Sequence, residues 1–491
     1  MNNILMYLGG LVVLILGALF AVPLFIDWNS YRGVFEEEAS RLLGRDVRVG
    51  GRVHLRLLPT PTLRLEKVRI SDTSGQTGEP FFRAETFTLY LAVAPLLQGT
   101  VEATDIELTR PVLHLAIDEA GQGNWRAFKR SEGRAGFSAS DIALPSVKLV
   151  DGVIALHGLK GDERLRIEKV NGEVGTPNLE GPYRVRLGFH QDGAEKELRL
   201  STARPEAAGT VRFKANIRVM ASGASYVVDG RLKDFLGAAT VEGELGAKLP
   251  LAMTAGPGGA KGPGEDALDL KSTLTASAAG FSLADVALSF ERGGRPQIVT
   301  GSVSGQWRQS LAVEAVFGSR WLDLDQIGGQ QKLAIGDLAQ TIADRLGWIL
   351  PKAARASVRL AVDQATVGGD ILSQIILALD RSADTITLRE LRATMPGGSR
   401  VDVRGLVRLD SGRPTRFDGE ATVRGSSLAR FLSWSLGAAA PELRRDSAFG
   451  LRGKLSIESG AVLVNDMMAE LAGIAMSGSV TYRHDGRRQL A

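Results

Sequence analysis

Residues 211–219 have the sequence Val-Arg-Phe-Lys-Ala-Asn-Ile-Arg-Val, and this alternation decides the fold class. Each odd-numbered side chain is apolar and each even-numbered one is polar or charged. A period of two is typical of a β-strand with one dry face and one polar face. The same pattern recurs at 183–189, over 47–65 and at 401–423. The sequence therefore predicts a mostly β protein whose strands form an antiparallel sheet.

The apolar positions of two such strands are candidates for an apolar groove. Their side chains would share one face of the sheet, because residues two apart in a strand point the same way. Periodicity leaves open whether this face fills an ordinary sandwich core or lines an open trough. The candidate groove residues are Tyr183, Val185, Leu187, Phe189, Val211, Phe213, Ala215, Ile217 and Val219.

Glycine-containing turns separate the strands at short intervals. The chain has 58 glycines in 491 residues and only 6% aromatic residues, which suits many strands joined by tight turns. Pairs of Asp, Asn or Gly followed by Gly favour positive φ and predict hairpins. These pairs are Asp151-Gly152, Asn171-Gly172, Asp192-Gly193, Asp229-Gly230, Gly293-Gly294, Gly397-Gly398 and Asp485-Gly486.

A few stretches have helix signals. A helix is predicted over Tyr31–Leu43, with Ser30 as its N-cap and Gly44 as its stop. Further helices are expected over Leu91–Gln98, Leu333–Leu350 and Leu428–Leu436, where they would cover edges of the sheet.

The run Ile4–Ile26 contains no ionisable residue in 23 positions. At about 1.5 Å per residue it is long enough for a hydrocarbon core of about 30 Å. It predicts a transmembrane anchor over 1–29, with the rest of the chain on one side of the membrane. A cleaved signal peptide is the alternative, but the leader Met1-Asn2-Asn3 has no basic residue and the apolar run is too long. So short a leader favours a cytoplasmic N-terminus.

Beyond the anchor we expect three segments. Residues 30–255 form an N-terminal β region with a juxtamembrane helix, 256–265 a flexible Gly/Pro linker, and 266–491 a C-terminal β region. The C-terminal region contains a loose repeat that begins at Phe281, Leu388 and Val462, each time a strand, a glycine-containing turn and a Gly-x-Val strand. The third repeat is cut short at Ala491, which leaves open a truncated region.

No residue pattern indicates catalysis. The absence of cysteine excludes disulfides and thiolate sites, and a net charge of +4 without a Lys/Arg run argues against a nucleic-acid partner. The five histidines lack metal-type spacing, and His114 is expected to be structural. Asp323 and Asp325 are expected to lie on a solvated strand face. We expect no enzyme activity, no catalytic residue, no metal and no cofactor.

Two long segments carry a resemblance to a known family. The first is FIDWNSYRGVFEEEASRLLGRDVRVGGRVHLRLLPTPTLRLEKVRISD from Phe25, and the second is VAPLLQGTVEATDIELTRPVLHLAIDEAGQGNW, ending at Trp125. Both resemble the start of the AsmA family of bacterial envelope proteins, and SRWLDLDQI and MPGGSRVDVRG look like its C-terminal units. The family's P…G-x-x-N-W arrangement falls on Pro111, Gly121, Gly123, Asn124 and Trp125, with Trp125 expected as a packing anchor and Asn124 in a left-handed turn.

The resemblance implies a single-pass inner-membrane protein of Gram-negative bacteria with its bulk in the periplasm. It implies an elongated, curled sheet with an apolar groove, covered in places by helices. The function it implies is outer-membrane biogenesis, with phospholipid handled or conducted along the groove. The alternative is a scaffold or regulatory factor that affects outer-membrane protein assembly through envelope protein contacts. The expected partners are thus the membrane, phospholipid and envelope proteins.

Overall fold

The computed structural model describes most of the chain after the apolar run. The residues that it describes are 27–57, 59–72, 78–97, 103–117, 123–127, 144–158, 163–177, 181–206, 209–234, 239–250, 267–292, 295–307, 311–327, 355–367, 369–382, 384–408, 416–436, 446–458, 461–484 and 488–490. Residues 1–26 of the predicted anchor, the predicted linker 256–265 and the predicted helix Leu333–Leu350 lie outside these residues. Among the described residues no helix has both the length and the hydropathy to cross a bilayer.

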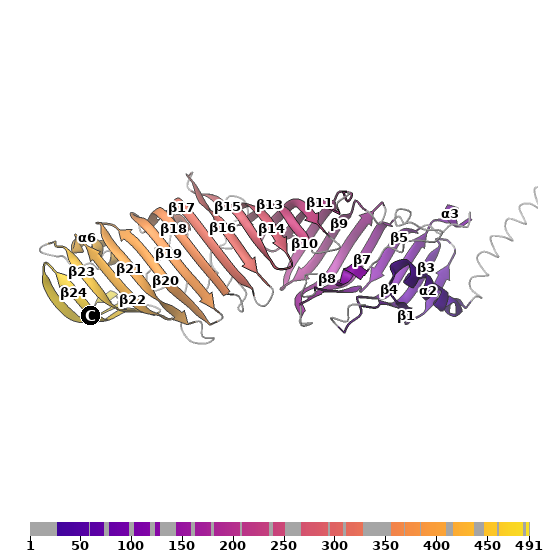
Figure 1. Cartoon of the computed structure of the whole chain (residues 1–491), viewed down its shortest axis with the longest axis horizontal. Helices are drawn as coiled ribbons and strands as arrows, with labels where there is room; N and C mark the ends of the chain where they lie inside the picture. The colour runs from indigo at the N-terminus through magenta and orange to yellow at the C-terminus, as the bar shows by residue number, and fades with distance from the viewer. Residues whose placement is uncertain are drawn as a thin grey trace, which may run out of the picture. The chain divides into compact units, whose positions relative to one another are not determined.

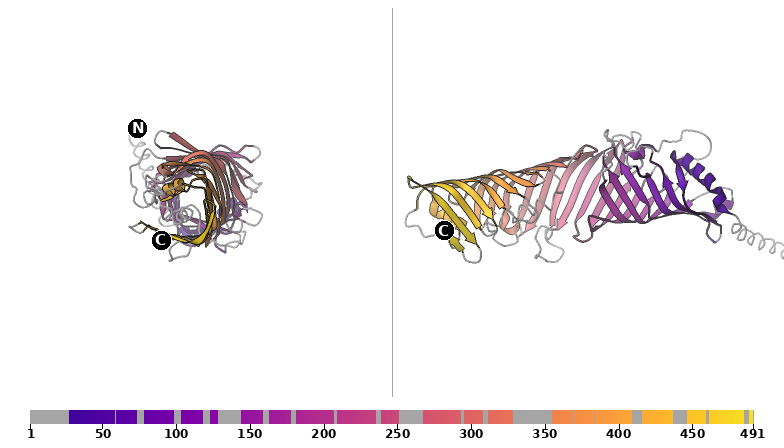
Figure 2. Two further views of the ribbon diagram at one scale, coloured as in Figure 1. Left: turned by 90° about the vertical axis from the view of Figure 1, so that its left-hand side faces the viewer. Right: turned by 90° about the horizontal axis from the view of Figure 1, so that it is seen from below.

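The chain forms two compact units that divide between Gly243 and Glu244, N-terminal to the predicted linker. Strands dominate both units, in a mixed, curled sheet (Figures 1 and 2). β13 (Thr240–Pro250) contains the division. The helices of the first unit are η1 (Trp28–Tyr31), α2 (Arg32–Leu43), α3 (Val93–Leu97) and η2 (Asn124–Ala127). Its strands are β1 (Val47–Val49), β2 (Val53–Arg56), β3 (Thr62–Ile70), β4 (Phe82–Leu91), β5 (Ala103–Thr109), β6 (Val112–Ala116), β7 (Leu144–His157), β8 (Glu163–Thr176), β9 (Arg184–Gln191), β10 (Ala194–Thr202), β11 (Val211–Val219) and β12 (Ser225–Lys233).

Neighbouring strands of the first unit follow one another in sequence, with three exceptions. β1 and β2 both pair with β3, β5 and β6 both pair with β4, and β5 and β6 both pair with β7. The pairs β5–β7 and β6–β7 are parallel, while the other pairs described here are antiparallel. The expected antiparallel sheet is thus confirmed in part: most pairs are antiparallel, but the sheet is mixed. A parallel pair needs a crossover connection instead of a hairpin, and the long connection from β6 to β7 supplies it.

The second unit continues as a series of antiparallel hairpins with one parallel pair, β17–β18. Its helices are α4 (Leu324–Ile327) and α6 (Leu428–Leu436). Its strands are β14 (Ala267–Ser277), β15 (Gly280–Arg292), β16 (Arg295–Gln306), β17 (Ala312–Asp323), β18 (Arg355–Val367), β19 (Asp370–Ser382), β20 (Thr385–Met395), β21 (Ser399–Arg408), β22 (Arg416–Gly425), β23 (Phe449–Glu458), β24 (Ala461–Leu471), β25 (Ile474–His484) and β26 (Arg488–Leu490).

The sequence repeat of the second unit corresponds to three hairpins, β15–β16, β20–β21 and β24–β25. In each hairpin the first strand has a register shift near its middle, between Leu283 and Val286, Leu388 and Leu391, and Val464 and Met467. A β-bulge of this kind increases strand twist. The repeat is thus a bulged hairpin, and its recurrence helps to curl the sheet.

The predicted helices are confirmed in part. α2 ends at Gly44, which has a φ of 65° as a helix stop requires. Ser30 is not the N-cap: the helical segment already begins with η1, where the Asp27 side chain accepts a hydrogen bond from the Asn29 backbone N. The helix expected at 91–98 is shorter, since Leu91 still belongs to β4. The helix over Leu428–Leu436 is confirmed as α6.

The predicted hairpins are likewise confirmed only in part. Those at 192–193 and 397–398 are confirmed, whereas 293–294 and 485–486 lie outside the described residues. Those at 151–152, 171–172 and 229–230 were wrong, because these residues lie inside β7, β8 and β12. Asp151 has a φ of 54° at the point where β7 leaves β5 and begins to pair with β6. A residue pair that tolerates positive φ serves a bulge as well as a turn.

Candidate functional site

Strand register aligns apolar side chains into two continuous rows across the first unit. Each row crosses β2, β3, β4, β5 and β7–β12 through residues that are direct cross-strand partners. The Leu200 row consists of Leu55, Leu63, Leu89, Ile106, Val147, Val174, Val185, Leu200, Ala215 and Val228. The Leu198 row consists of Val53, Leu65, Phe87, Leu108, Leu149, Gly172, Leu187, Leu198, Ile217 and Tyr226. At a strand spacing of about 4.8 Å, each row is about 40 Å long.

The Leu200 row is only half-buried. None of its side chains is fully buried, and Tyr226 at the end of the Leu198 row is 37% exposed. Apolar side chains in the core of a two-layer sandwich are mostly fully buried. The rows therefore form an apolar surface that protein only partly covers.

The opposite face of the same strands is charged. Between the two apolar rows, the register places Arg64, Thr88, Glu107, Lys148, Glu173, Arg186, Arg199 and Asn216 in one line. Lys148 lies 3.5 Å from Glu107, and Lys214 lies 3.2 Å from Asp229. Exposed pairs of this kind contribute little to stability. They identify this side as the water-facing one.

The structure places the candidate groove residues on this apolar face, with one exception. Val185 and Ala215 belong to the Leu200 row, Leu187 and Ile217 to the Leu198 row, and the remaining apolar positions of β9 and β11 alternate in phase with them. Tyr183 precedes β9; its backbone N donates to Thr202 Oγ1 at 2.8 Å, and burial raises the pKa of its phenol. The contributions of β2–β5, β7, β8, β10 and β12 were missed, because alternation in a single strand carries no register.

Helix α2 covers the beginning of the apolar face. Phe35, Ala39 and Leu43 pack on a buried cluster formed by Val47, Val49, Val53 and Val68. The short strands β1–β3 therefore have a filled core. Beyond them no residue of either row is fully buried.

The second unit also has rows of apolar cross-strand partners, but several of their members, such as Leu379 and Ile386, are fully buried and belong to a core cluster. The Leu379 row consists of Leu274, Leu283, Val303, Ala315, Val358, Leu379, Leu388, Gly405, Gly419, Leu455, Val464 and Val480. The Arg381 row consists of Ala276, Phe281, Gly305, Val313, Ala356, Arg381, Ile386, Val407, Phe417, Ile457 and Val462. The opposite face has the ion pairs, such as Lys454–Asp466 at 2.7 Å. α6 packs at one end of this unit, with Phe431 against Phe449 at a ring-centroid distance of 5.2 Å.

The motif at 123–125 is a structural clamp on β6. Asn124 Oδ1 accepts from Ala116 N at 3.1 Å, and Asn124 Nδ2 donates to the His114 carbonyl at 3.0 Å. A Cβ on Gly123 would lie 2.3 Å from the Trp125 ring, so only glycine leaves room for the indole. Trp125 is thus a packing residue as expected. Asn124 does not adopt the expected left-handed backbone conformation. It is the first residue of η2, and its side chain makes hydrogen bonds to β6 of the kind that a neighbouring strand would make.

Arg45 connects this clamp to the start of the sheet. Its guanidinium is buried, donates to the Asn124 carbonyl and to the Ser71 carbonyl at 3.1 Å, and lies 4.4 Å from the centre of the Phe81 ring. Burial lowers the pKa of Arg45, and Asp72 at 4.0 Å opposes this effect. Pro111 is buried where β5 gives way to β6, and Gly121 lies outside the described residues.

Two histidines far apart in sequence meet in the same place. His114 on β6 and His157 on β7 are 6% and 8% exposed, and Nδ1 of His114 lies 3.1 Å from Nε2 of His157. Burial, followed by the neighbouring imidazole of His157, lowers the pKa of His114. One nitrogen must donate and the other accept, so this hydrogen bond requires at least one neutral ring. Within the part of the chain that the structure describes, no three metal-binding side chains gather.

The comparisons with known proteins bear on the first unit. No curated protein and no solved structure matches the chain. The sequence profile of the AsmA family matches residues 3–226, which cover the clamp and both apolar rows almost to their end. Residues 3–226 of this chain are therefore similar to the AsmA family.

Proposed function

We propose that this protein handles phospholipid, whose acyl chains lie on the apolar faces of its two units. It would act as a single-pass inner-membrane protein with its bulk in the periplasm and would serve outer-membrane biogenesis. The AsmA-family region supports an envelope role. The observation that carries the proposal is the pair of apolar rows in the first unit, which stay in register from strand to strand and, Val53 apart, are not fully buried.

The energetics favour sliding over tight binding. Each buried methylene group contributes about 0.8 kcal/mol. Moving an acyl chain by one strand, about 4.8 Å, exchanges Val, Leu or Ile contacts for others of the same kind. The free energy of the bound acyl chain is then nearly constant along a row. This behaviour requires no bond to be made or broken, so we propose a role without catalysis.

Charged substitutions on the apolar face test the proposal. Leu200→Glu and Ala215→Glu should lower the amount of phospholipid that copurifies with the full chain, because a carboxylate would disrupt the apolar row. Asn216→Glu is the matched control, since Asn216 lies beside Ala215 on the charged face. Mass spectrometry of the bound lipids measures the effect. Equal phospholipid in all variants, or none in the unmodified protein, would overturn the proposal.

A second candidate function is a scaffold that contacts envelope proteins. It is favoured by the β24–β25 hairpin, where Ile474 and Met476, which share one face of β25, are 66% and 45% exposed. Exposed apolar side chains close together are typical of protein contacts. Crosslinkers on this hairpin would then capture proteins, whereas crosslinkers on the Leu200 row would capture no lipid.

A further inference from the structure

The charged face of the first unit begins with a group of exposed arginines. Strand alternation places them on the side of β1–β4 that is opposite the buried cluster beneath α2. The acidic residues on this side of the same strands are Glu66 and Glu85, with Asp46 just before β1, and Glu85 already pairs with Arg110. We call the group the arginine face, and it consists of Arg48, Arg52, Arg56, Arg64, Arg69 and Arg83.

Three members of the arginine face are direct cross-strand neighbours. The register pairs Arg48 with Arg69, and Arg69 with Arg83. Arg48 lies 3.1 Å from Asp46 and 3.5 Å from Glu36, which compensate its charge. Arg69 and Arg83 form no ion pair with any residue that the structure describes. Because like charges directly opposite each other destabilise a sheet, the stability of the fold does not account for this pair.

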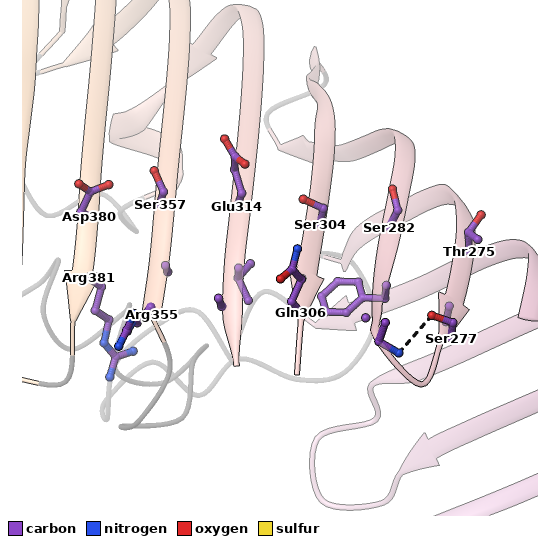
Figure 3. A pocket seen from close by; sticks show the side chains of 18 residues that line it. Thr275, Ser277, Ser282, Ser304, Gln306, Glu314, Arg355, Ser357, Asp380 and Arg381 are labelled. Carbon is purple, nitrogen blue, oxygen red and sulfur yellow. Dashed lines mark hydrogen bonds between the residues drawn. The ribbon is translucent and has the colours of Figure 1, made fainter. Parts of the chain in front are cut away.

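Other parts of the charged faces show how like charges can be separated or compensated. In the second unit, Ser357 separates the two carboxylates in a line of cross-strand partners formed by Thr275, Ser282, Ser304, Glu314, Ser357 and Asp380 (Figure 3). In the first unit, Arg186 is the direct partner of Arg199, but Glu197 lies 2.8 Å from Arg199. The pair Arg69–Arg83 has neither a spacer nor a carboxylate partner among the described residues.

The arginine face lies next to η1, the first described element after the predicted anchor. The apolar run ends at Ile26, and η1 follows from Trp28. Asn29 Oδ1 accepts a hydrogen bond from Val53 N at 3.1 Å, so η1 contacts β2 directly. Tyr31 is 49% exposed, with its ring centroid 5.8 Å from that of Trp28. Since Trp and Tyr are enriched at membrane–water interfaces, we expect β2 to lie close to the bilayer surface.

We propose that the arginine face binds phosphate groups of anionic phospholipids at the surface of the bilayer that holds the anchor. This inference rests on the single-pass attachment in the proposed function and adds a second contact with the same membrane. A guanidinium suits this contact because it presents paired N–H donors to phosphate oxygens. Anionic headgroups would supply the countercharges that Arg69 and Arg83 lack. The Leu200 and Leu198 rows begin on the other face of β2 and β3, so the contact would keep their start beside a source of lipid.

Single introduced cysteines test this proposal, because the chain has no cysteine of its own. The full chain is reconstituted in vesicles with a fluorophore at His54→Cys, on the arginine face, or at Asn216→Cys, on the same side of β11. Quenching by lipids that carry a nitroxide on the headgroup reports contact with the membrane surface. Position 54 should be quenched more in vesicles with phosphatidylglycerol than in pure phosphatidylcholine, and about 1 M salt should remove the difference. Position 216 should not respond to lipid composition.

Combined substitution of three arginines tests their contribution. Arg64→Gln, Arg69→Gln and Arg83→Gln together should lower the ratio of docked to undocked protein about a hundredfold, since each arginine near an anionic surface contributes about fivefold. The unfolding temperature should be unchanged or higher, because the Arg69–Arg83 repulsion is removed. The matched control removes three exposed arginines from the same side of β9, β11 and β12, and should leave quenching at position 54 unchanged: Arg186→Gln, Arg218→Gln and Arg231→Gln.

Three results would count against the proposal in different ways. Equal quenching at position 54 in both lipid compositions, or quenching that the substitutions at 64, 69 and 83 leave unchanged, would overturn the arginine contact and leave the proposed function in place. Release of the chain from the vesicles by salt or alkaline washing would overturn the single-pass attachment itself. In cells, crosslinks from position 54 to an acidic protein in place of lipid would assign the arginine face to a protein partner.

Discussion

Gly123 is a position at which a neighbouring side chain leaves room only for glycine. Its hydrogen faces the Trp125 ring, and a methyl group in its place would overlap that ring. Gly123→Ala should therefore lower the free energy of unfolding by about 1–3 kcal/mol, the range for overpacking. Thermal unfolding of the full chain measures this. Gly33→Ala in α2 is the control, because nothing lies near its Cβ position and alanine favours helix there.

A second residue-scale prediction concerns pH and His114. Its pKa is lowered in the folded protein, so the folded state takes up a proton at lower pH than the unfolded chain, whose imidazole titrates near 6.5. The stabilising contribution is complete above about pH 6.5 and falls as the pH drops below that value, by at most about 1.4 kcal/mol per pH unit for one proton. The charged neighbours Glu79, Arg83 and Glu163 modulate this shift, together with His157.

Hydrogen exchange in β6 and β7, corrected for the intrinsic pH dependence of exchange, measures this effect. Between pH 7.5 and 5.5 protection should fall in these strands. His114→Gln should flatten the dependence, since glutamine does not titrate. A dependence of the same steepness in His114→Gln would assign it to other groups.

At the scale of the element, α6 depends on its cap. Ser427 Oγ accepts from Arg430 N at 3.1 Å and donates to Asp446 Oδ2 at 2.6 Å. Ser427→Ala should destabilise α6 by about 1 kcal/mol. Amide exchange over Leu428–Leu436 should become faster while β20–β21 stays protected. Ser433→Ala, at an exposed position of the same helix, should leave exchange unchanged.

For the strands, the alternation in the sequence predicts which residues share a face but not how neighbouring strands align. Alternation identified which residues of β9 and β11 share a face, because strand geometry alone decides it. It could not supply register, which depends on bulges such as that between Leu283 and Val286. Nor did it predict the parallel pair β17–β18, although the predicted helix Leu333–Leu350 falls in the connection between these strands. Residue pairs with Gly were ambiguous between turns and bulges, as Asp151-Gly152 demonstrates.

Contacts between residues distant in sequence could not be predicted either. Arg45 and Asn124 are 79 positions apart, and His114 and His157 are 43 apart. The spacing of the histidines gave no metal signal, and only the parallel pairing of β6 with β7 brings them together. The position of Arg381 within an apolar row could not be predicted either, because it depends on the register of the neighbouring strands.

At the scale of the whole molecule, each unit presents one apolar face and one charged face. The apolar residues stay aligned over ten strands of the first unit although its strands differ in length and in direction. Selection for a folded core alone requires burial, which the Leu200 row lacks. A surface that contacts acyl chains requires continuity and accessibility, and the rows have both.

A photocrosslinking amino acid placed at Ile217 and, separately, at Asn216 tests whether acyl chains contact the apolar face. These neighbours in β11 lie on opposite faces of the sheet, so the two variants differ in little else. In membranes of the cells that produce the full chain, we expect phospholipid adducts at position 217, identified by mass spectrometry, and none at position 216. Adducts with proteins at position 217, in place of lipid, would show that this face binds protein and not lipid.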